Sequence, residues 1–243
     1  DKTMAKSMFL IVGETGVGKS SSLELLPNQN EWLYFNCDAG KEIPFPHNFI
    51  EVKITDPKDI PATIEDVIAN NRPIKGIIVD TVTFMMEMFK SKHVKTASDT
   101  FAAWDAYGEF FRDLVQDKLN RFEGDVILIA HIDKKYNKEA MVEQTVVPVS
   151  GSLAKVGLEA YFTNVIQASV KTLTDLSAYT NPMLNITEEE KIVGIKHVFQ
   201  TMKTADSVNT RIRSPRRMWT INETFIDNDV LQVMMRQHDF YKK

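Results

Sequence analysis

The stretch GETGVGKS, residues 13–20, decides the fold of this chain, because it fits the pattern G-x-x-x-x-G-K-[ST] at every fixed position. The apolar run Met8–Val12 leads into it as a buried strand would, and a helix is predicted over Ser20–Leu26, ending before Pro27. Glycines let successive N–H groups of such a loop point inward around phosphate oxygens, and the N-terminus of the helix adds a favourable dipole. The sequence therefore predicts a nucleotide site, not a glycine-rich turn without a ligand.

The loop residues divide into two chemical roles. Lys19 would reach the β and γ phosphates of ATP as a point charge, and the hydroxyl of Ser20 would ligate Mg²⁺. The predicted nucleotide-binding set comprises Gly13, Glu14, Thr15, Gly16, Val17, Gly18, Lys19, Ser20 and Ser21.

A carboxylate at the end of a neighbouring strand would complete the magnesium site. The run Gly76–Asp80 predicts a buried strand that ends in Asp80, and an acidic side chain there can hold Mg²⁺ through water, opposite Ser20. The alternative is that Asp80 caps the helix that begins at Thr81, a role compatible with the first.

Hydrolysis also needs a group that positions water, and three residues could act near the γ phosphate. Asp38, just past the second predicted strand, is the first choice for a general base, with Glu42 in reserve. A turn-forming role explains Asp38 equally well. His131 closes a buried strand at the sheet edge where ligands bind, and could sense the phosphate there, or could be a satisfied strand-end histidine.

Short apolar runs alternate with helix-like stretches along the first two thirds of the chain, as in an α/β fold with a mostly parallel sheet flanked by helices. Strands are expected at residues 32–37, 49–54, 76–80 and 126–130, and helices at residues 56–70, 81–90 and 98–122. We expect a single domain over residues 1–243, with a core at about 7–170.

The chain changes character after this core. The polar residues 133–143 predict an exposed loop or hairpin, residues 146–149 and 161–170 predict strands, and residues 172–190 predict a mobile insertion. Residues 192–202 predict a strand that pairs back with 161–170, so the C-terminal strands should be antiparallel. A basic loop at 204–217 and a short helix around 228–237 complete the pattern.

Composition narrows the class of protein. The chain has 243 residues, 43% apolar and 26% charged, and no apolar run approaches the roughly 20 residues that span a bilayer. The polar start Asp1–Ser7 predicts no signal peptide, and the lone Cys37 favours a reducing, cytoplasmic setting. Net charge is −4, but residues 191–217 hold seven Lys or Arg and one Asp. This segment is either a solvated charged face or a phosphate contact.

These motifs together resemble the RecA-like recombinase fold, and in particular the small phage ATPases of the Sak type used in single-strand annealing. The likeness covers about residues 8–170 and rests on five pieces: Gly13–Ser20, Asn36-Cys37-Asp38, Ile78-Val79-Asp80-Thr81, Trp104-Asp105-Ala106-Tyr107-Gly108 and Ile127-Leu128-Ile129-Ala130-His131.

The resemblance implies an ATPase, with ATP and Mg²⁺ as ligands, that acts on single-stranded DNA in homologous recombination or annealing. It places Asp38 where the recombinases have a catalytic Glu, one methylene longer, and His131 where a switch residue couples ATP to DNA. The loop with Lys134, Lys135 and Lys138 would match the second DNA-binding loop, and Lys90–Lys95 the first.

The resemblance also implies partners. Members of this group assemble head to tail on single-stranded DNA, and a single-strand binding protein is a further implied partner. A neighbouring copy supplies cations to the ATP, and the residues that would do so here are Lys203, Arg211 and Arg213. By the same likeness the chain would work in the cytoplasm, that of the host cell if it is phage-encoded.

Other functions share the nucleotide motif. A helicase loader or a packaging motor would have the same site and a different partner. A GTPase switch is less favoured, because the stretch Asp80-Thr81-Val82-Thr83 lacks the glycine expected three residues after the Asp. A small-molecule kinase is also less favoured, since no Arg-rich lid follows the helical region.

Overall fold

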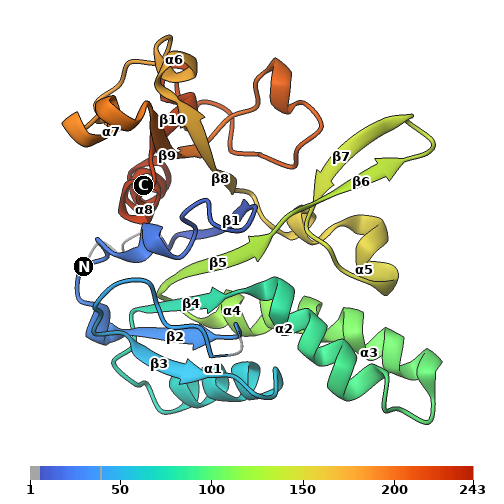
Figure 1. Ribbon diagram of the computed structural model, residues 1–243. Coiled ribbons are helices and arrows are strands. Elements are labelled where there is room, and N and C mark those ends of the chain that lie inside the picture. Colours follow the sequence, from blue (N-terminus) through green and yellow to red (C-terminus); the bar gives the residue numbers. More distant parts are fainter. Residues whose placement is uncertain (1–5, 39, 243) are drawn as a thin grey trace.

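The computed structural model describes residues 6–38 and 40–242, so the first five residues of the polar start lie outside it. An eight-stranded sheet with the order β10-β9-β8-β1-β5-β4-β2-β3 forms its centre (Figure 1). The strands of this sheet are β1 (Met8–Gly13), β2 (Trp32–Asn36), β3 (Ile50–Lys53), β4 (Gly76–Asp80), β5 (Asp125–His131), β8 (Val165–Thr172), β9 (Ile195–Gln200) and β10 (Phe225–Asp227).

The pairing is parallel from β8 through β1, β5, β4 and β2 to β3, whereas β9 and β10 add antiparallel strands at the other end. Helices cover the parallel part. The prediction of a mostly parallel α/β sheet flanked by helices, with antiparallel C-terminal strands, is therefore confirmed. The strand expected at residues 49–54 is found as β3, at the edge of the sheet.

Side chains of the central strands are buried on both faces of the sheet, which explains their continuous apolar sequences. In β1, Leu10 and Val12 enter one core cluster, while Phe9 and Ile11 enter the other. This split follows from the two-residue period of a strand.

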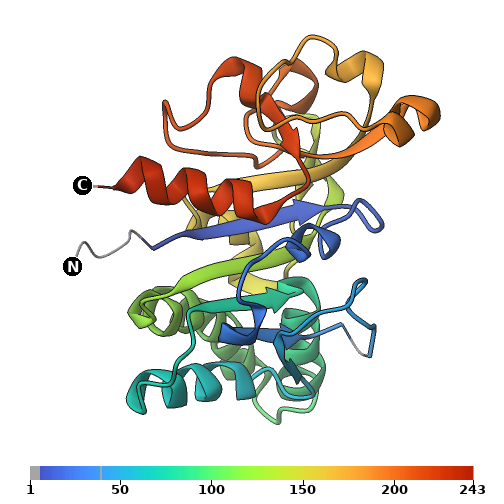
Figure 2. The same cartoon turned by 90° about the vertical axis from the view of Figure 1, so that its left-hand side faces the viewer.

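Helices α1 (Asp59–Ala69), α2 (Val82–Phe89), α3 (Thr100–Asp113) and α4 (Leu119–Arg121) supply or flank the first cluster. The opposite face is covered by α8 (Val230–Tyr241), whose Val230, Val233 and Met234 pack on the second cluster. Figure 2 shows α8 running beside β1. No helix in the part of the chain that the structure describes is long and apolar enough to cross a membrane.

Between β5 and β8 the chain leaves the sheet. The strands β6 (Asp133–Asn137) and β7 (Val142–Val146) form a separate antiparallel hairpin, which confirms the hairpin expected at residues 133–143. In Figure 1 this hairpin projects from the body of the molecule, above the short helix α5 (Gly151–Val156). The strand expected at 146–149 is wrong, because the strand ends at Val146 after beginning at Val142.

The segment 172–190, expected to be a mobile insertion, instead folds against the sheet. It contains α6 (Leu173–Leu176) and leads into α7 (Glu188–Val193), which begins with a capping box between Thr187 and Glu190. Its apolar side chains form a third, small cluster with Val198 and Phe225 of β9 and β10. The many polar residues that suggested mobility are used in specific hydrogen bonds.

The helix predicted over Ser20–Leu26 is also wrong in extent. Only a 3-10 turn, Ser21–Leu23, forms there. One physical reason is local: serines are weak helix formers because their hydroxyls bond nearby backbone, as Ser22 Oγ does to the Lys19 carbonyl. The helix dipole expected at the phosphate loop is therefore largely absent.

Candidate nucleotide site

The loop Gly13–Ser20 follows β1 directly and turns on two left-handed glycines. Gly16 has φ +81° and Gly18 has φ +93°, values that other residues rarely adopt. A Cβ at Gly13 would lie 2.8 Å from Val17 and 2.9 Å from the Ala168 carbonyl, so this position also excludes a side chain. The glycines thus let the loop curl tightly at the carboxyl edge of the sheet.

Lys19 lies inside the curl. Its side chain is buried, and Nζ donates hydrogen bonds to the carbonyls of Gly13 (2.9 Å) and Glu14 (2.5 Å). Burial lowers the pKa of Lys19 to about 8, with Asp80 opposing the shift, so the amine is still mostly protonated at pH 7. A buried ammonium group that is bonded to neutral carbonyls favours the binding of an anionic ligand, which would compensate its charge.

Asp80 lies next to the loop, although the two are not on neighbouring strands. The strand β5 runs between β1 and β4, so the expectation of adjacent strands was wrong. Ser20 Oγ nevertheless donates to Asp80 Oδ2 at 2.6 Å, and the hydroxyl of Tyr34 donates to the same oxygen. The capping alternative is not what the structure shows, because Thr81 is the residue that caps α2, accepting from the Phe84 N–H.

The electrostatics of Asp80 are dominated by burial, which raises its pKa, while the hydrogen bonds from Ser20 and Tyr34 oppose the shift. Burial and the same carboxylate raise the pKa of Tyr34, which stays a neutral donor. Sequence reasoning missed Tyr34. Its place in the apolar run Trp32–Asn36 marked it only as a core residue.

These oxygens suit magnesium. Mg²⁺ prefers oxygen ligands and is usually held by one or two carboxylates, with water and substrate phosphates completing the octahedron. Ser20 and Asp80 supply a hydroxyl and a carboxylate at one point, beside the phosphate loop. Within residues 6–38 and 40–242 no cluster of three His, Cys, Asp or Glu forms a self-sufficient metal site. A hydroxyl and a carboxylate at one point fit a metal whose remaining ligands are water and nucleotide phosphates.

Asp38 reaches the same cavity from the end of β2. Its carboxylate pairs with Lys41 at 2.9 Å, and its backbone N–H is held by Asn36. Its main-chain carbonyl accepts from the Lys41 N–H, so the turn is closed by backbone and the side chain remains available to the cavity. Glu42 is further out, with an exposed carboxylate 4.0 Å from Lys53.

His131 also lines the cavity. Its ring packs edge-on against Phe84, with centroids 5.2 Å apart. Burial and then the positive charge of Lys19 lower the pKa of His131, which keeps the imidazole neutral at pH 7. Its Nε2 is buried and finds no hydrogen-bond partner among the described residues, so the alternative of a satisfied histidine does not hold.

A cavity of about 250 Å³ joins these groups. Besides the predicted residues it is lined by Lys41, Thr81 and His197, which sequence reasoning missed. The nucleotide-binding residues that line it are Thr15, Gly16, Gly18, Lys19, Ser20 and Ser21. Glu14 and Val17 line a neighbouring cavity of about 510 Å³ with residues of β8.

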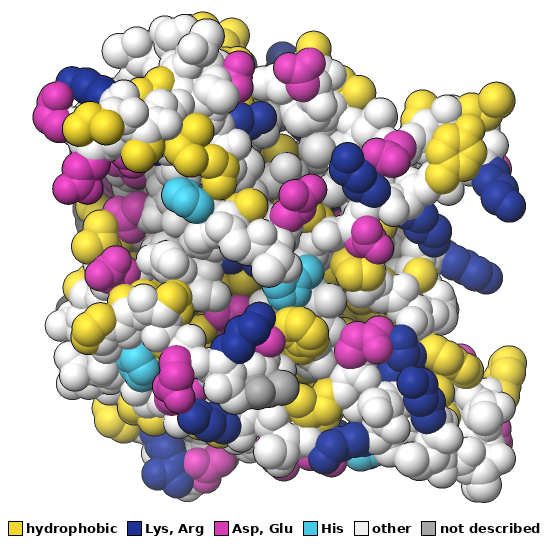
Figure 3. All heavy atoms as spheres, viewed as in Figure 1, with side chains coloured by type: hydrophobic (Ala, Val, Ile, Leu, Met, Phe, Trp, Pro, Cys, Tyr) yellow, Lys and Arg dark blue, Asp and Glu magenta, His cyan; other side chains and the backbone are white. Residues whose placement is uncertain are grey.

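The three hairpin lysines, Lys134, Lys135 and Lys138, lie together on a second surface. They line a cavity of about 620 Å³ between the hairpin and α5, together with Lys155 and the exposed ring of Tyr136. Figure 3 shows Lys and Arg side chains along this side of the molecule. Arg211, predicted to reach a neighbouring ATP, lines this cavity and not the nucleotide cavity.

The other predicted contacts are scattered. Arg213 is exposed and pairs through its backbone with Val165, and Lys203 Nζ donates to the Val208 carbonyl. The segment Lys90–Lys95 is not a loop: residues 90–94 form a π-helical turn that continues α2, with Val94 buried and Lys90 paired to Glu87.

Comparison with known protein families identifies the family to which the chain belongs. A family model described as an AAA domain matches residues 5–214, most of the chain. The chain belongs to the AAA domain family. This AAA domain protein is therefore a P-loop NTPase, and the family supports nucleotide binding and hydrolysis. The comparison with curated proteins gives no match.

Proposed function

We propose that this AAA domain protein is a Mg²⁺-dependent ATPase that acts on single-stranded DNA, as RecA-like and Sak-type proteins do in recombination or annealing. The observation that carries the proposal is a direct connection between two surfaces. His131 lies in the nucleotide cavity, and the hairpin with its lysines begins two residues later, at Asp133.

Each residue of the nucleotide cavity has a chemical task. Lys19 and the N–H groups of the loop bind the triphosphate. Ser20 and Asp80 would hold Mg²⁺, which neutralises charge on the phosphate oxygens when bound. Asp38 is the group placed to accept a proton from the attacking water, and Lys41 holds its carboxylate in place.

His131 is the group placed to report on the γ phosphate. A neutral imidazole can donate from Nε2 to one phosphate oxygen, and this nitrogen has no other partner among the described residues. If the His131 ring moves, the movement can reach strand β6 directly, because only Ile132 lies between His131 and the first residue of β6.

The hairpin surface has the chemistry of a single-strand site. Lysines follow phosphates, and an exposed aromatic ring offers a face on which a base can stack. Lys134, Lys135 and Lys138 supply the charges and Tyr136 the ring, which is 57% exposed. By this proposal copies of the chain assemble head to tail on DNA, and Lys203, Arg211 and Arg213 are the cations available to a neighbouring ATP.

The test is ATP turnover with and without single-stranded DNA, at several salt concentrations. We expect DNA to stimulate turnover, and we expect the double variant Lys134→Ala, Lys135→Ala to bind DNA at least about 10-fold more weakly with a flatter salt dependence. The variant Lys75→Ala, Lys242→Ala removes the same charge far from the hairpin and should behave as wild type. A rate of ATP turnover that does not change when single-stranded DNA is added would favour a helicase loader or a packaging motor. A higher affinity for GTP than for ATP would indicate a GTPase switch.

A further inference from the structure

Two side chains from the C-terminal strands reach the phosphate loop. His197, on β9, holds the carbonyl of Val17 with Nδ1 at 3.0 Å. Asn228, between β10 and α8, donates from Nδ2 to the carbonyl of Gly18 at 2.8 Å. About 180 and 210 residues of sequence separate each pair, so no local pattern could have predicted these contacts.

These two bonds fix the orientation of the loop's own donors. A trans peptide unit is planar, and its C=O and N–H point in opposite directions. Holding the Val17 carbonyl therefore fixes the direction of the Gly18 N–H, and holding the Gly18 carbonyl does the same for the Lys19 N–H. Inward N–H groups at this part of the loop are the donors that cradle phosphate.

Both side chains lie close to the backbone of Gly18, whose left-handed φ favours glycine. A Cβ there would lie 2.8 Å from Asn228 Nδ2 and 3.2 Å from His197 Nδ1. Gly18 has φ +93° and no side chain of its own to fix it. Its carbonyl also accepts from the Ser22 N–H at 3.1 Å, so Asn228 adds a second bond there, whereas the Val17 carbonyl is held by His197.

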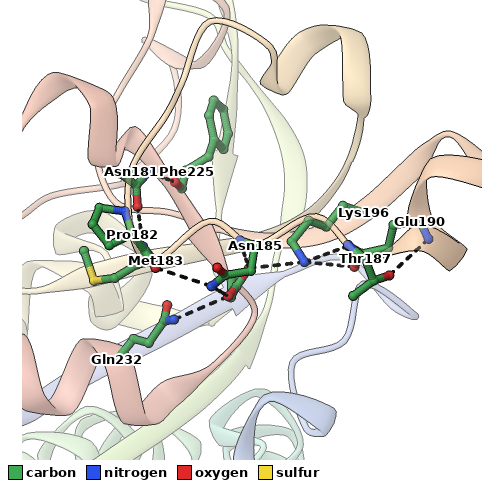
Figure 4. A network of polar contacts seen from close by, with 10 residues as sticks. Asn181, Pro182, Met183, Asn185, Thr187, Glu190, Lys196, Phe225 and Gln232 are labelled. Carbon is green, nitrogen blue, oxygen red and sulfur yellow. Dashed lines mark hydrogen bonds and ion pairs between the residues drawn. The ribbon is translucent and has the colours of Figure 1, made fainter.

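The residues that directly precede His197 and Asn228 are themselves fixed by ion pairs and hydrogen bonds. Lys196 and Asp227 directly precede them in sequence and are joined by an ion pair of 3.2 Å. Lys196 is almost fully buried and also pairs with Glu190 at 2.8 Å (Figure 4). Asn185 donates to Asp227 at 2.9 Å. The segment 172–193 thus braces the two strands from which the loop is held.

We propose that His197 and Asn228 are positioning residues of the nucleotide site, which orient the Gly18 and Lys19 N–H groups toward the phosphates of ATP. This proposal rests on ATP binding at the loop Gly13–Ser20. It extends the nucleotide site to the C-terminal strands, which contribute none of the motif residues. The antiparallel end of the sheet would then take part in ATP binding.

Isosteric variants separate hydrogen bonding from bulk. The amide nitrogen of Asn overlays Nδ1 of histidine, whereas that of Gln overlays Nε2. We expect His197→Ala and His197→Gln to bind ATP about 10-fold more weakly, and His197→Asn to bind as wild type. Asn228→Asp replaces the donor by a charged acceptor facing the Gly18 carbonyl, and it should weaken ATP binding more than Asn228→Ala does.

ATP affinity would be measured by calorimetry, with thermal unfolding of each variant without nucleotide as the check on folding. Equal affinity for ATP in wild type, His197→Ala and Asn228→Asp would overturn the proposal. So would equal affinities of the Asn and Gln variants at position 197. Wild type itself must bind ATP and Lys19→Ala must not. If wild type fails to bind ATP, the proposed function is wrong, whereas His197 and Asn228 variants that bind as wild type refute only this inference.

Discussion

Replacing Asp80 by Asn separates the structural role of this carboxylate from its chemical role. Asp80 is 5% exposed, and its Oδ2 accepts hydrogen bonds from Ser20 and Tyr34. An Asn side chain has the same shape and keeps an oxygen that can accept both bonds. The negative charge is lost, and an NH₂ group takes the place of the second oxygen.

Two opposing terms set the effect on stability. A hydrogen bond to a charged acceptor contributes about 1 kcal/mol more than one to a neutral acceptor, so two such bonds lose about 2 kcal/mol. Against this, burying an ionised carboxylate costs several kcal/mol, and burial is the reason that the pKa of Asp80 is raised. We expect the free energy of unfolding without nucleotide and metal to be unchanged or higher, within about 2 kcal/mol.

The rate of ATP turnover should fall in this variant, although its stability is maintained. Losing a group that orients or holds a metal typically costs about 10- to 100-fold in metal affinity or activity. We therefore expect Asp80→Asn to bind nucleotide nearly as wild type and to lose Mg²⁺-dependent turnover by at least about 10-fold. Tyr34→Phe is the matched control, since it removes one hydrogen bond to the carboxylate but keeps its charge, and it should retain the Mg²⁺ dependence.

Two assays decide the question: urea unfolding in the presence of EDTA, and ATP turnover over a range of Mg²⁺ concentrations. The reasoning is refuted if Asp80→Asn turns over ATP with the Mg²⁺ dependence of wild type. It is equally refuted if the variant loses more than about 3 kcal/mol of stability, because Asp80 would then be a structural residue first.

Three further outcomes are expected. Lys19→Ala should abolish ATP binding, measured by calorimetry, and normal turnover in this variant would end the ATPase interpretation. Lys196→Met should lower the free energy of urea unfolding by about 3 kcal/mol, because Asp227 loses a buried partner; a change below about 0.5 kcal/mol would contradict this. His238 and Asp125 form an ion pair of 2.7 Å that raises the pKa of His238 and lowers that of Asp125. A raised histidine pKa gives stability that is complete below the unfolded value and is lost as the pH rises through the folded one, so unfolding from pH 6 to 8.5 should show a loss of about 1 kcal/mol that His238→Gln lacks.

The sequence predicted the sheet well because its central strands are nearly continuous apolar runs. Gly76–Asp80 is found as predicted, and the run that ends at His131 is extended by one residue at its start, to Asp125. Such runs are typical of strands that are buried on both faces of a parallel sheet. The motif Gly13–Ser20 likewise determined the position of the site, since its glycines and lysine act within one loop.

What the sequence did not show depends on contacts between distant segments. In the sequence Tyr34 cannot be told from other core aromatic residues, because its role depends on the hydrogen bond from its hydroxyl to Asp80 of β4. His197 and Asn228 carry no motif and gain their role only when β9 and β10 fold back beside the loop. The segment 172–190 looked mobile because its polar residues have partners, such as Asp227, that lie far away in sequence.

The most direct test is a structure of the protein with Mg²⁺ and a non-hydrolysable ATP analogue. We expect the triphosphate within the loop Gly13–Ser20, Lys19 Nζ moved from the Gly13 and Glu14 carbonyls to the phosphates, and the metal beside Ser20 and Asp80. A nucleotide bound elsewhere on the protein, or a metal held without Asp80, would contradict this assignment.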